Sequence, residues 1–298
     1  MDIKEYNTVI KTRRNAIFPF EIPLFLGPIS LWIVLFVFGP LAITIIFSLL
    51  KSGEFGKIIP IFTLNNYYKI LKPEYLRVFV RSFLYALSAN IICLIIGYPV
   101  AYLAAKHGGR WKGMLILLII IPSWTSYLIR LYALKTIIGN NGIINSILLN
   151  LHIIKQPMQM LYKPGAVIFG LVYSWIPFMI LPIYSSLEGI NPELYEASLD
   201  LGAKPLVTLF KVAIPLTKGG IFAGTILVFV PALGDWLVPH FLGGSKVMMI
   251  GNLVEYKFIN VGNIPEGASL ATLLAVVIIL ILYTLIKIGG EEALEKVV

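Results

Sequence analysis

The chain has 298 residues, of which 58% are hydrophobic and only 13% are charged, and its mean hydropathy is +0.87. In soluble domains about a quarter of all residues are charged, so this composition excludes an ordinary soluble protein. The formal net charge is +9, but the basic residues flank apolar runs and no basic-aromatic module is present. This pattern favours anionic lipid over nucleic acid as the partner of the positive charge.

Six apolar runs predict six transmembrane helices, because a membrane-spanning helix needs about 20 such residues. The first 23 residues are polar and basic, and the run that follows is too long for the apolar part of a signal peptide, so we expect it to be a retained first span. The expected spans are residues 24–50, 78–105, 113–134, 164–187, 217–241 and 267–288. Residues 24–288 then form one transmembrane domain between an N-terminal tail, 1–23, and a C-terminal tail, 289–298.

The connections between the spans differ in character. Before the second span, FTLNNYYKILKPEYLRVF predicts an amphipathic segment at the membrane surface. Gly97, Tyr98 and Pro99 predict a kink near the end of that span. The loop 106–112 is short and basic, and the Gly and Asn residues within 135–163 predict a short interfacial helix. Lys and Arg are divided almost equally between the two sides, so charge alone does not decide the topology.

The longest polar interruption, NPELYEASLDLGAKPLVTLFKVAIP, covers residues 191–215 and predicts two short helices with a break between them. Asn191 suits the N-cap of the first helix and Pro192 its first position, where a missing N–H costs nothing. Pro205 can begin the second helix, and Pro215 is expected to mark its end.

Acidic residues line one face of the first of these helices. Glu193, Glu196 and Asp200 share that face, and acids in a first turn also suit the helix dipole. Gly202 is placed to end the helix in the left-handed conformation.

This stretch resembles the EAA motif of the permease subunits of ABC importers, which runs Glu-Ala-Ala, three residues, Gly, nine residues and Ile-x-Leu-Pro. The spacing is the same here, with small or apolar residues in place of the second Ala, the Ile and the Leu. The matching residues are Glu196, Ala197, Ser198, Gly202, Val212, Ile214 and Pro215. In that family the segment is the coupling helix, which docks into a groove on a cytoplasmic ATPase. The resemblance implies an ATPase-coupling role for Glu193, Glu196, Ala197, Ser198, Asp200, Gly202 and Pro215.

A wider resemblance, to the first permease subunit of spermidine/putrescine ABC importers, covers nearly the whole chain. The segments that carry it are FTLNNYYKIL, IIGYPVAYLAAK, IPSWTSYLIRLYALK, GLVYSWIPFMILPIYSSLE, PALGDWLVPHFLGG and MMIGNLVEYKF. It implies an all-α, six-span permease of the type I importer (MetI-like) fold in the bacterial cell membrane, with both termini cytoplasmic. It also implies a heterodimer with a homologous second permease, two copies of a cytoplasmic ATPase and an extracytoplasmic polyamine-binding protein.

The sequence lacks the motifs of a catalyst. It has no G-x-x-x-x-G-K-[ST] phosphate loop, no G-x-S-x-G or H-E-x-x-H motif and no paired carboxylates within an expected span. We therefore expect a transport subunit that is not an enzyme, with ATP and Mg²⁺ bound by the partner ATPase. Other cargoes (ferric iron, thiamine or a phosphonate) are the alternatives within the family. An ATP-independent transporter or channel and an integral membrane enzyme are the alternatives outside it.

Cysteine and histidine indicate neither a disulfide nor a metal site. The single cysteine, Cys93, lies inside an apolar run and cannot form an intrachain disulfide. His107, His152 and His240 are far apart and have no ligand spacing. We therefore expect no cofactor in this chain.

Asp235 is the only acidic residue well inside an expected span, which makes it a candidate for contact with a cationic substrate. Aromatic faces also attract ammonium groups. The candidate substrate path is Asp235, Trp236, Trp124, Tyr127, Tyr173 and Trp175. Asp235 has two alternative roles, as a cap on a helix broken after Gly234 or as the ion-pair partner of Arg130 at a subunit contact. For the aromatic residues, the alternative is packing or a place in the interfacial aromatic belt.

Overall fold

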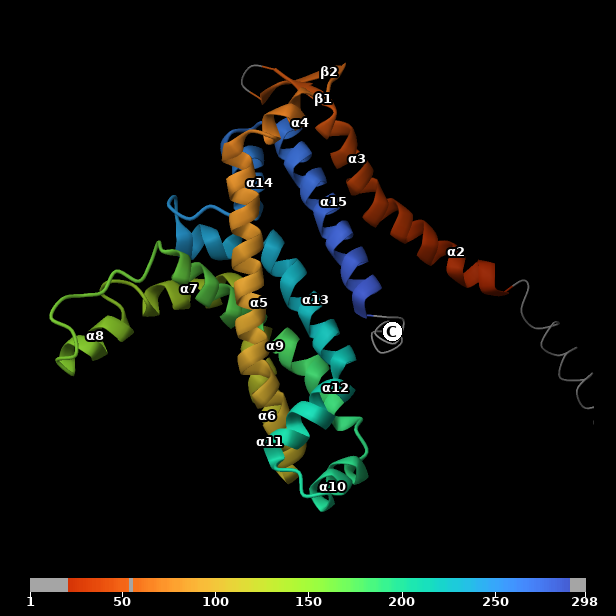
Figure 1. Ribbon diagram of the computed structural model, residues 1–298. Helices are drawn as coiled ribbons and strands as arrows, with labels where there is room; N and C mark the ends of the chain where they lie inside the picture. The colour runs from red at the N-terminus through yellow and green to blue at the C-terminus, as the bar shows by residue number, and fades with distance from the viewer. Residues whose placement is uncertain (1–20, 54–55, 290–298) are drawn as a thin grey trace, which may run out of the picture.

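The computed structural model describes residues 21–53 and 56–289, which form an elongated helical bundle with one short sheet at an end (Figure 1). The expected tails therefore lie almost wholly outside the described residues. Four helices are long and apolar enough to cross a membrane, and up to six if each of two bent pairs counts as one span. The four are Gly27–Ser48, Pro73–Lys106, Pro164–Glu188 and Ile264–Lys287.

The first span diverges from the rest of the bundle (Figure 1). It consists of α2 (Glu21–Ile33), the π-helical turn η1 (Val34–Phe38) and α3 (Gly39–Ser48). Only its α3 end packs closely, against α15 (Ile264–Gly289). Large apolar side chains along η1 are exposed, as suits a helix surrounded by lipid hydrocarbon.

The third and fifth expected spans are not single straight helices. The third bends by 93° between Gly109–Trp124 and Tyr127–Ile137, because the backbone of Thr125 and Ser126 is extended. The fifth is α13 (Lys218–Gly234), which stops at the extended backbone of Asp235 instead of continuing to residue 241. The pieces of the third span are η3 (Gly109–Trp111), α6 (Lys112–Ile120), η4 (Ile121–Trp124) and α7 (Tyr127–Ile137).

The end of the molecule near α15's start carries a β-hairpin that the sequence did not predict. Strand β1 (Leu50–Ser52) pairs antiparallel with β2 (Ile58–Phe62). The expected amphipathic segment becomes α4 (Asn65–Ile70) and the first turns of α5 (Pro73–His107). The remaining short elements are α8 (Ile143–Asn150), which is the expected interfacial helix, η6 (Pro239–Gly243), α14 (Ile250–Glu255) and η7 (Tyr256–Asn260).

The core lies between α5, α9 (Pro164–Glu188) and α13, with α9 in the middle. Met179 of α9 is fully buried and faces a glycine on each neighbour. A Cβ on Gly97 would lie 3.3 Å from Met179 Cγ, and one on Gly224 would lie 2.8 Å from its Sδ. Such small residues let helix backbones approach closely, which is how membrane helices associate without a hydrophobic driving force. Helix α5 runs through Pro99 without interruption.

Candidate coupling and substrate sites

Residues 191–216 form a helical hairpin at the end of the molecule opposite the β-hairpin, and we call them the coupling hairpin (Figure 1). Its first helix is α10 (Pro192–Asp200). Asn191 is the N-cap, as predicted, and its Oδ1 accepts a hydrogen bond from the Glu193 N–H at 3.1 Å. Gly202 has a φ of +81°, the left-handed conformation that the sequence led us to expect.

Two backbone hydrogen bonds close the end of α10. The N–H of Gly202 donates to Leu199 O at 2.8 Å, and the N–H of Ala203 donates to Ser198 O at 3.1 Å. This pair of bonds is the Schellman arrangement, which satisfies the free carbonyl groups at a helix end. The turn after α10 is therefore set by the backbone of Gly202.

The second helix of the coupling hairpin begins at Pro205, as expected. It contains α11 (Pro205–Thr208), the π-helical turn η5 (Leu209–Ala213) and α12 (Ile214–Leu216). Pro215 was expected to end it, but the helix continues through Leu216. Pro215 lies in the last turn of this continuous helix, where its ring leaves the backbone without one N–H donor. The chain then turns by 70° into α13.

The coupling hairpin presents both acidic and apolar side chains to the outside. Glu193, Glu196, Ala197 and Asp200 are exposed, whereas Ser198 is half-buried and its Oγ lies 2.8 Å from Thr208 Oγ1 of the second helix. The exposed fractions of large apolar residues are 88% for Leu201, 69% for Leu206 and 65% for Phe210. Exposed apolar side chains grouped within one polar element are typical of a protein interaction surface.

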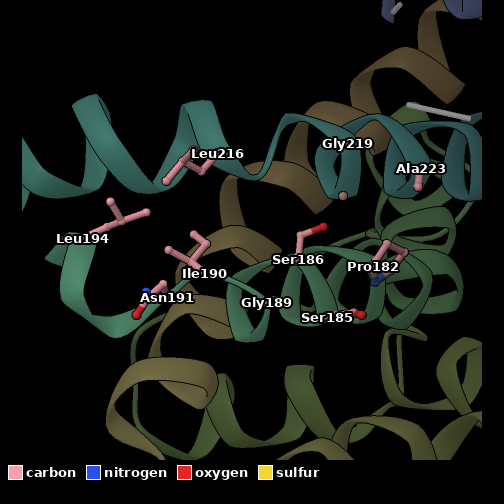
Figure 2. Close-up of a pocket in the computed structure, with 11 residues that line it drawn as sticks. Pro182, Ser185, Ser186, Gly189, Ile190, Asn191, Leu194, Leu216, Gly219 and Ala223 are labelled. Atoms are coloured by element: carbon pink, nitrogen blue, oxygen red, sulfur yellow. The ribbon is translucent and has the colours of Figure 1, made fainter. Parts of the chain in front are cut away.

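A cavity of about 610 Å³ lies between the α9–α10 connection on one side and α12 and the start of α13 on the other (Figure 2). Ser186 and Ile190 at the end of α9 line one side, and Leu216 and Gly220 line the other. Leu194 of α10 lies at its edge (Figure 2). The hairpin is therefore not packed tightly against α13 along its length.

Asp235 lies at the break after α13 and is 6% exposed. Its Oδ1 accepts hydrogen bonds from the N–H groups of Leu237 and Val238, both at 3.0 Å, so it caps the turn that follows. Its Oδ2 accepts from the Tyr127 hydroxyl and from Trp175 Nε1, the latter at 3.2 Å. The structure thus brings three of the six candidate path residues together around one buried carboxylate, and we call them the Asp235 cluster (Tyr127, Trp175 and Asp235).

The other three candidate path residues lie outside this cluster. Trp124 is 75% exposed at the 93° bend, and Tyr173 is exposed on α9. Trp236 is 41% exposed and makes an edge-to-face contact with His240, with ring centroids 6.3 Å apart. These positions fit the packing or lipid-facing alternative as well as a path.

Arg130 makes no ion pair with Asp235 among the described residues. Its guanidinium lies 5.4 Å from the centroid of the Tyr127 ring, and its Nε is buried without a hydrogen-bond partner. Within the described residues of this chain Asp235 is therefore a helix cap, and its pairing with Arg130 at a subunit contact stays a prediction.

Two groups of polar residues were missed by the sequence reasoning. Near the start of α5, Tyr75 donates to Glu266 of α15, and Lys257 Nζ lies 2.8 Å from Glu266 Oε1. At the other end, Lys106 of α5 covers the ring of Tyr195 from α10. The residues of each group are far apart in the sequence and meet only in the fold. The one sequence pattern that could have indicated the second group is the spacing of Tyr98, Tyr102 and Lys106, which places them on one face of α5. The described residues contain no group of three or more His, Cys, Asp or Glu side chains that could hold a metal ion.

Residues 97–288 match the family described as binding-protein-dependent transport system inner membrane component. The spermidine/putrescine transport system permease protein PotB of Escherichia coli (strain K12) is 41% identical over 251 residues, covering 84% of this chain and 91% of that protein. The protein of the same description from Haemophilus influenzae is 38% identical over 253 residues, covering 85% and 88%.

Two solved structures of a bacterial ABC transporter that imports the acidic polysaccharide alginate share the fold. One has a TM-score of 0.69 and 14% sequence identity, and the match covers 94% of this chain and 98% of the other. The second holds an alginate-loaded periplasmic protein and has a TM-score of 0.70 at 14% identity, covering 91% and 94%.

Proposed function

Because this chain belongs to the family of binding-protein-dependent transport system inner membrane components, the permeases of ABC importers, we propose that it carries spermidine and putrescine into the cell. The observation that carries this proposal is the 41% identity to a spermidine/putrescine permease over 84% of the chain. The fold alone could not name the cargo, since the alginate importer shares it at 14% identity. The chain is a multi-pass membrane protein whose family works with a substrate-binding protein.

We propose three further partners and an orientation. A homologous second permease completes the membrane part, and two copies of an ABC ATPase bind ATP and Mg²⁺, since this sequence has no phosphate loop. The coupling hairpin meets the ATPase, so it lies on the cytoplasmic side together with both termini. The β-hairpin, at the opposite end in Figure 1, then faces the polyamine-binding protein. No nucleic acid takes part.

The proposed mechanism is alternating access. Closure of the ATPase dimer around ATP displaces the coupling hairpin, through Glu193, Glu196, Ala197, Ser198, Asp200, Gly202 and Pro215. The two permeases then open toward the binding protein, which releases its polyamine into the path between them. The exposed apolar side chains of Leu201, Leu206 and Phe210 support the hairpin as the docking element, because an ATPase groove would cover them.

We assign the Asp235 cluster to the polyamine path. A carboxylate has about four acceptor sites, and the bonds to Tyr127, Trp175, Leu237 and Val238 use them all. Asp235 therefore holds the Tyr127 and Trp175 rings in place and adds a negative charge behind them. Ammonium groups of a polyamine would meet the ring faces, where cation–π attraction is strongest.

The test is uptake of labelled spermidine by cells that contain the complete transporter, with and without this chain. We expect uptake to disappear without the chain and excess unlabelled putrescine to compete, whereas ferric iron, thiamine and a phosphonate do not. Competition by one of those three, or no spermidine uptake at all by the complete system, would assign the cargo to another branch of the family. Uptake that persists without the ATPase would indicate a channel or secondary transporter.

A further inference from the structure

One side chain of α10 reaches from the coupling hairpin into the helical bundle. Tyr195 is half-buried and packs against the main apolar core, while most other residues of α10 are exposed. The Lys106 ammonium lies over its ring, with Nζ 3.9 Å from the ring centroid. The Tyr195 hydroxyl is buried without a hydrogen-bond partner, and burial raises its pKa well above the ordinary value. Lys106 therefore contacts the face of the Tyr195 ring, while the hydroxyl lies near Tyr102 and Tyr98 of the same helix, α5.

The same face of α5 contacts the other end of the coupling hairpin. Tyr98, two helical turns before Lys106, has its hydroxyl 3.0 Å from Thr217 Oγ1 in a buried contact. Thr217 lies at the 70° turn between α12 and α13, and its Oγ1 also donates to Ala213 O at 2.8 Å. Residues eight positions apart lie on one face of a helix. One face of α5 thus contacts both the first helix of the hairpin and Thr217, the residue that follows it.

Helix α5 also contacts the opposite end of the molecule. It has 35 residues, a length of roughly 50 Å at the usual rise of an α-helix. Near its start, Tyr75 binds Glu266 of α15, and Ser82 Oγ accepts the Ile250 N–H of α14 at 2.7 Å. A single continuous helix therefore joins the coupling hairpin to the end that carries the β-hairpin (Figure 1).

We propose that Lys106 and Tyr195 are positioning residues that transmit the movement of the coupling hairpin to α5, and this proposal rests on the proposed function. The cavity in Figure 2 separates α10 from α13, so direct packing between these two helices does not carry the displacement. Tyr195, with Lys106 over its ring and Tyr102 beside it, provides a contact between α10 and the long helix that can carry the displacement instead. Without the Lys106–Tyr195 contact, the coupling hairpin would still move with the ATPase, but the far end of α5 would not move.

The first test uses the complete transporter in lipid vesicles, with the second permease, the ATPases and the loaded binding protein. Spermidine uptake and ATP hydrolysis are measured together. We expect Lys106→Met and Tyr195→Leu to lower the spermidine carried per ATP hydrolysed up to about tenfold, the loss that a half-buried cation–π contact would give. Lys106→Arg and Tyr195→Phe keep the cation and the ring, so we expect near-normal ratios. Lys218→Met, an exposed lysine near the 70° turn, is the matched control.

The second test needs no substrate. In a Cys93→Ala background, Glu74→Cys places one thiol at the exposed start of α5, and its labelling by a water-soluble maleimide is followed with and without a non-hydrolysable ATP analogue. We expect nucleotide to change the labelling rate when Lys106 is present and not after Lys106→Met. If Lys106→Met leaves both the ratio and the nucleotide response intact, the proposal is wrong. Equal losses of uptake and hydrolysis would also overturn it, because they indicate a purely structural role. A wild-type transporter that responds to nucleotide but carries no spermidine would instead refute the cargo.

Discussion

The indole nitrogen of Trp175 lies 3.2 Å from Asp235 Oδ2, a hydrogen bond that joins the middle of α9 to the residue where α13 ends. Helix α13 ends at Asp235, where the backbone is extended. The carboxylate of Asp235 accepts hydrogen bonds from the N–H groups of the turn that follows. The same carboxylate accepts from Tyr127 of α7. One buried acid thus connects three helices, and its hydrogen bonds offset the cost of burying a charged group.

Two substitutions of Asp235 should distinguish its role as a helix cap from the role of its negative charge in transport. Asp235→Ala removes a cap, which costs about 1 kcal/mol, and leaves the Trp175 indole without its acceptor, which costs about 1 to 3 kcal/mol more. We expect a clear fall in the amount of folded protein in the membrane. Asp235→Asn keeps the cap oxygen but turns an N–H₂ group toward Trp175, so Trp175→Phe is added to remove that conflict.

The Asp235→Asn/Trp175→Phe double variant tests the path directly. We expect its folded amount to recover toward that of Trp175→Phe alone, while spermidine uptake per folded transporter stays several-fold lower because the negative charge is gone. Uptake equal to that of Trp175→Phe alone, at matched amounts of protein, would remove Asp235 from the polyamine path and leave it as a helix cap.

The coupling hairpin should tolerate substitution in folding but not in transport. A Cβ on Gly202 would meet no atom within 4 Å, so a substitution there is opposed only by the φ of +81°. The left-handed conformation costs roughly 1 to 2 kcal/mol for other residues, and a β-branched side chain is the least compatible with it. We expect Gly202→Val to lower uptake at an unchanged membrane amount, with Gly202→Ala intermediate. Glu196→Lys, which reverses a charge on the exposed face, should uncouple transport in the same way.

Gly262→Val is the matched control for Gly202→Val. Gly262 has a φ of +69° and lies at the opposite end of the molecule, and a Cβ added to it would also meet no atom within 4 Å. The two valine variants therefore carry the same kind of backbone strain. Equal losses of uptake in both, or full uptake in Gly202→Val and Glu196→Lys, would contradict the assignment of the hairpin to ATPase coupling.

Local sequence patterns predicted the features that depend on neighbouring residues. Span lengths follow from apolar runs, because the bilayer thickness fixes how many residues are needed. The ends of α10 follow from Asn191 and Gly202, whose backbone preferences act within a few positions. The same residues predicted the two helices of this hairpin and the turn between them, while its role in coupling stays a prediction.

Features that depend on direction or on distant contacts were not predictable in the same way. Average hydropathy does not predict the 93° bend after Trp124, because the helices on both sides of the bend are apolar. The Asp235 cluster joins residues 108 and 60 positions apart, so its hydrogen bonds leave no local pattern. The same holds for Lys106 and Tyr195. Residue type alone made Asp235, Tyr127 and Trp175 candidates for the path. Only the fold shows that these three meet and that Trp124 lies apart from them.

The ion pair at the outer end of α15 should stabilise the molecule only when both partners are present. The side chains of Lys257 and Glu266 are 17% and 8% exposed. Burial lowers the pKa of Lys257, but its hydrogen bonds to Glu266 and Tyr75 outweigh burial and the pKa ends above its ordinary value. We expect Lys257→Met or Glu266→Gln alone to lower the free energy of unfolding of the purified protein by about 3 kcal/mol. Each change leaves a buried group without its partner.

The double variant Lys257→Met/Glu266→Gln should recover much of that loss. The exposed pair of Lys112 and Glu188, 3.0 Å apart, provides the comparison, and Lys112→Met should change stability little because water screens it. Thermal unfolding in the same lipid or detergent would measure all four variants. Additive losses in the double variant would mean that the two outer residues act independently and not as a pair.

The contact between α9 and α13 near the cavity of Figure 2 should fail if Gly220 gains a side chain. A Cβ on Gly220 would collide with Ser186 Oγ and would lie 2.6 Å from Pro182 O, closer than real Cβ atoms approach their neighbours. Ser186 can rotate away, but the Pro182 carbonyl belongs to the backbone of α9 and cannot. Gly220→Ala should therefore cost about 1 to 3 kcal/mol, the usual range for overpacking, and Gly220→Val should cost more.

Adding Ser186→Ala to Gly220→Ala tests which neighbour causes the loss. We expect only partial recovery of thermal stability, because the clash with the Pro182 carbonyl remains. Gly234→Ala, at the other end of α13, should be close to neutral, since its Cβ would meet nothing within 4 Å. Full recovery in the Ser186→Ala/Gly220→Ala variant would mean that the helices can separate slightly at this point and that the hydroxyl alone set the limit. Equal losses for Gly220→Ala and Gly234→Ala would indicate a general helix effect of glycine replacement and would contradict the close approach of α9 and α13.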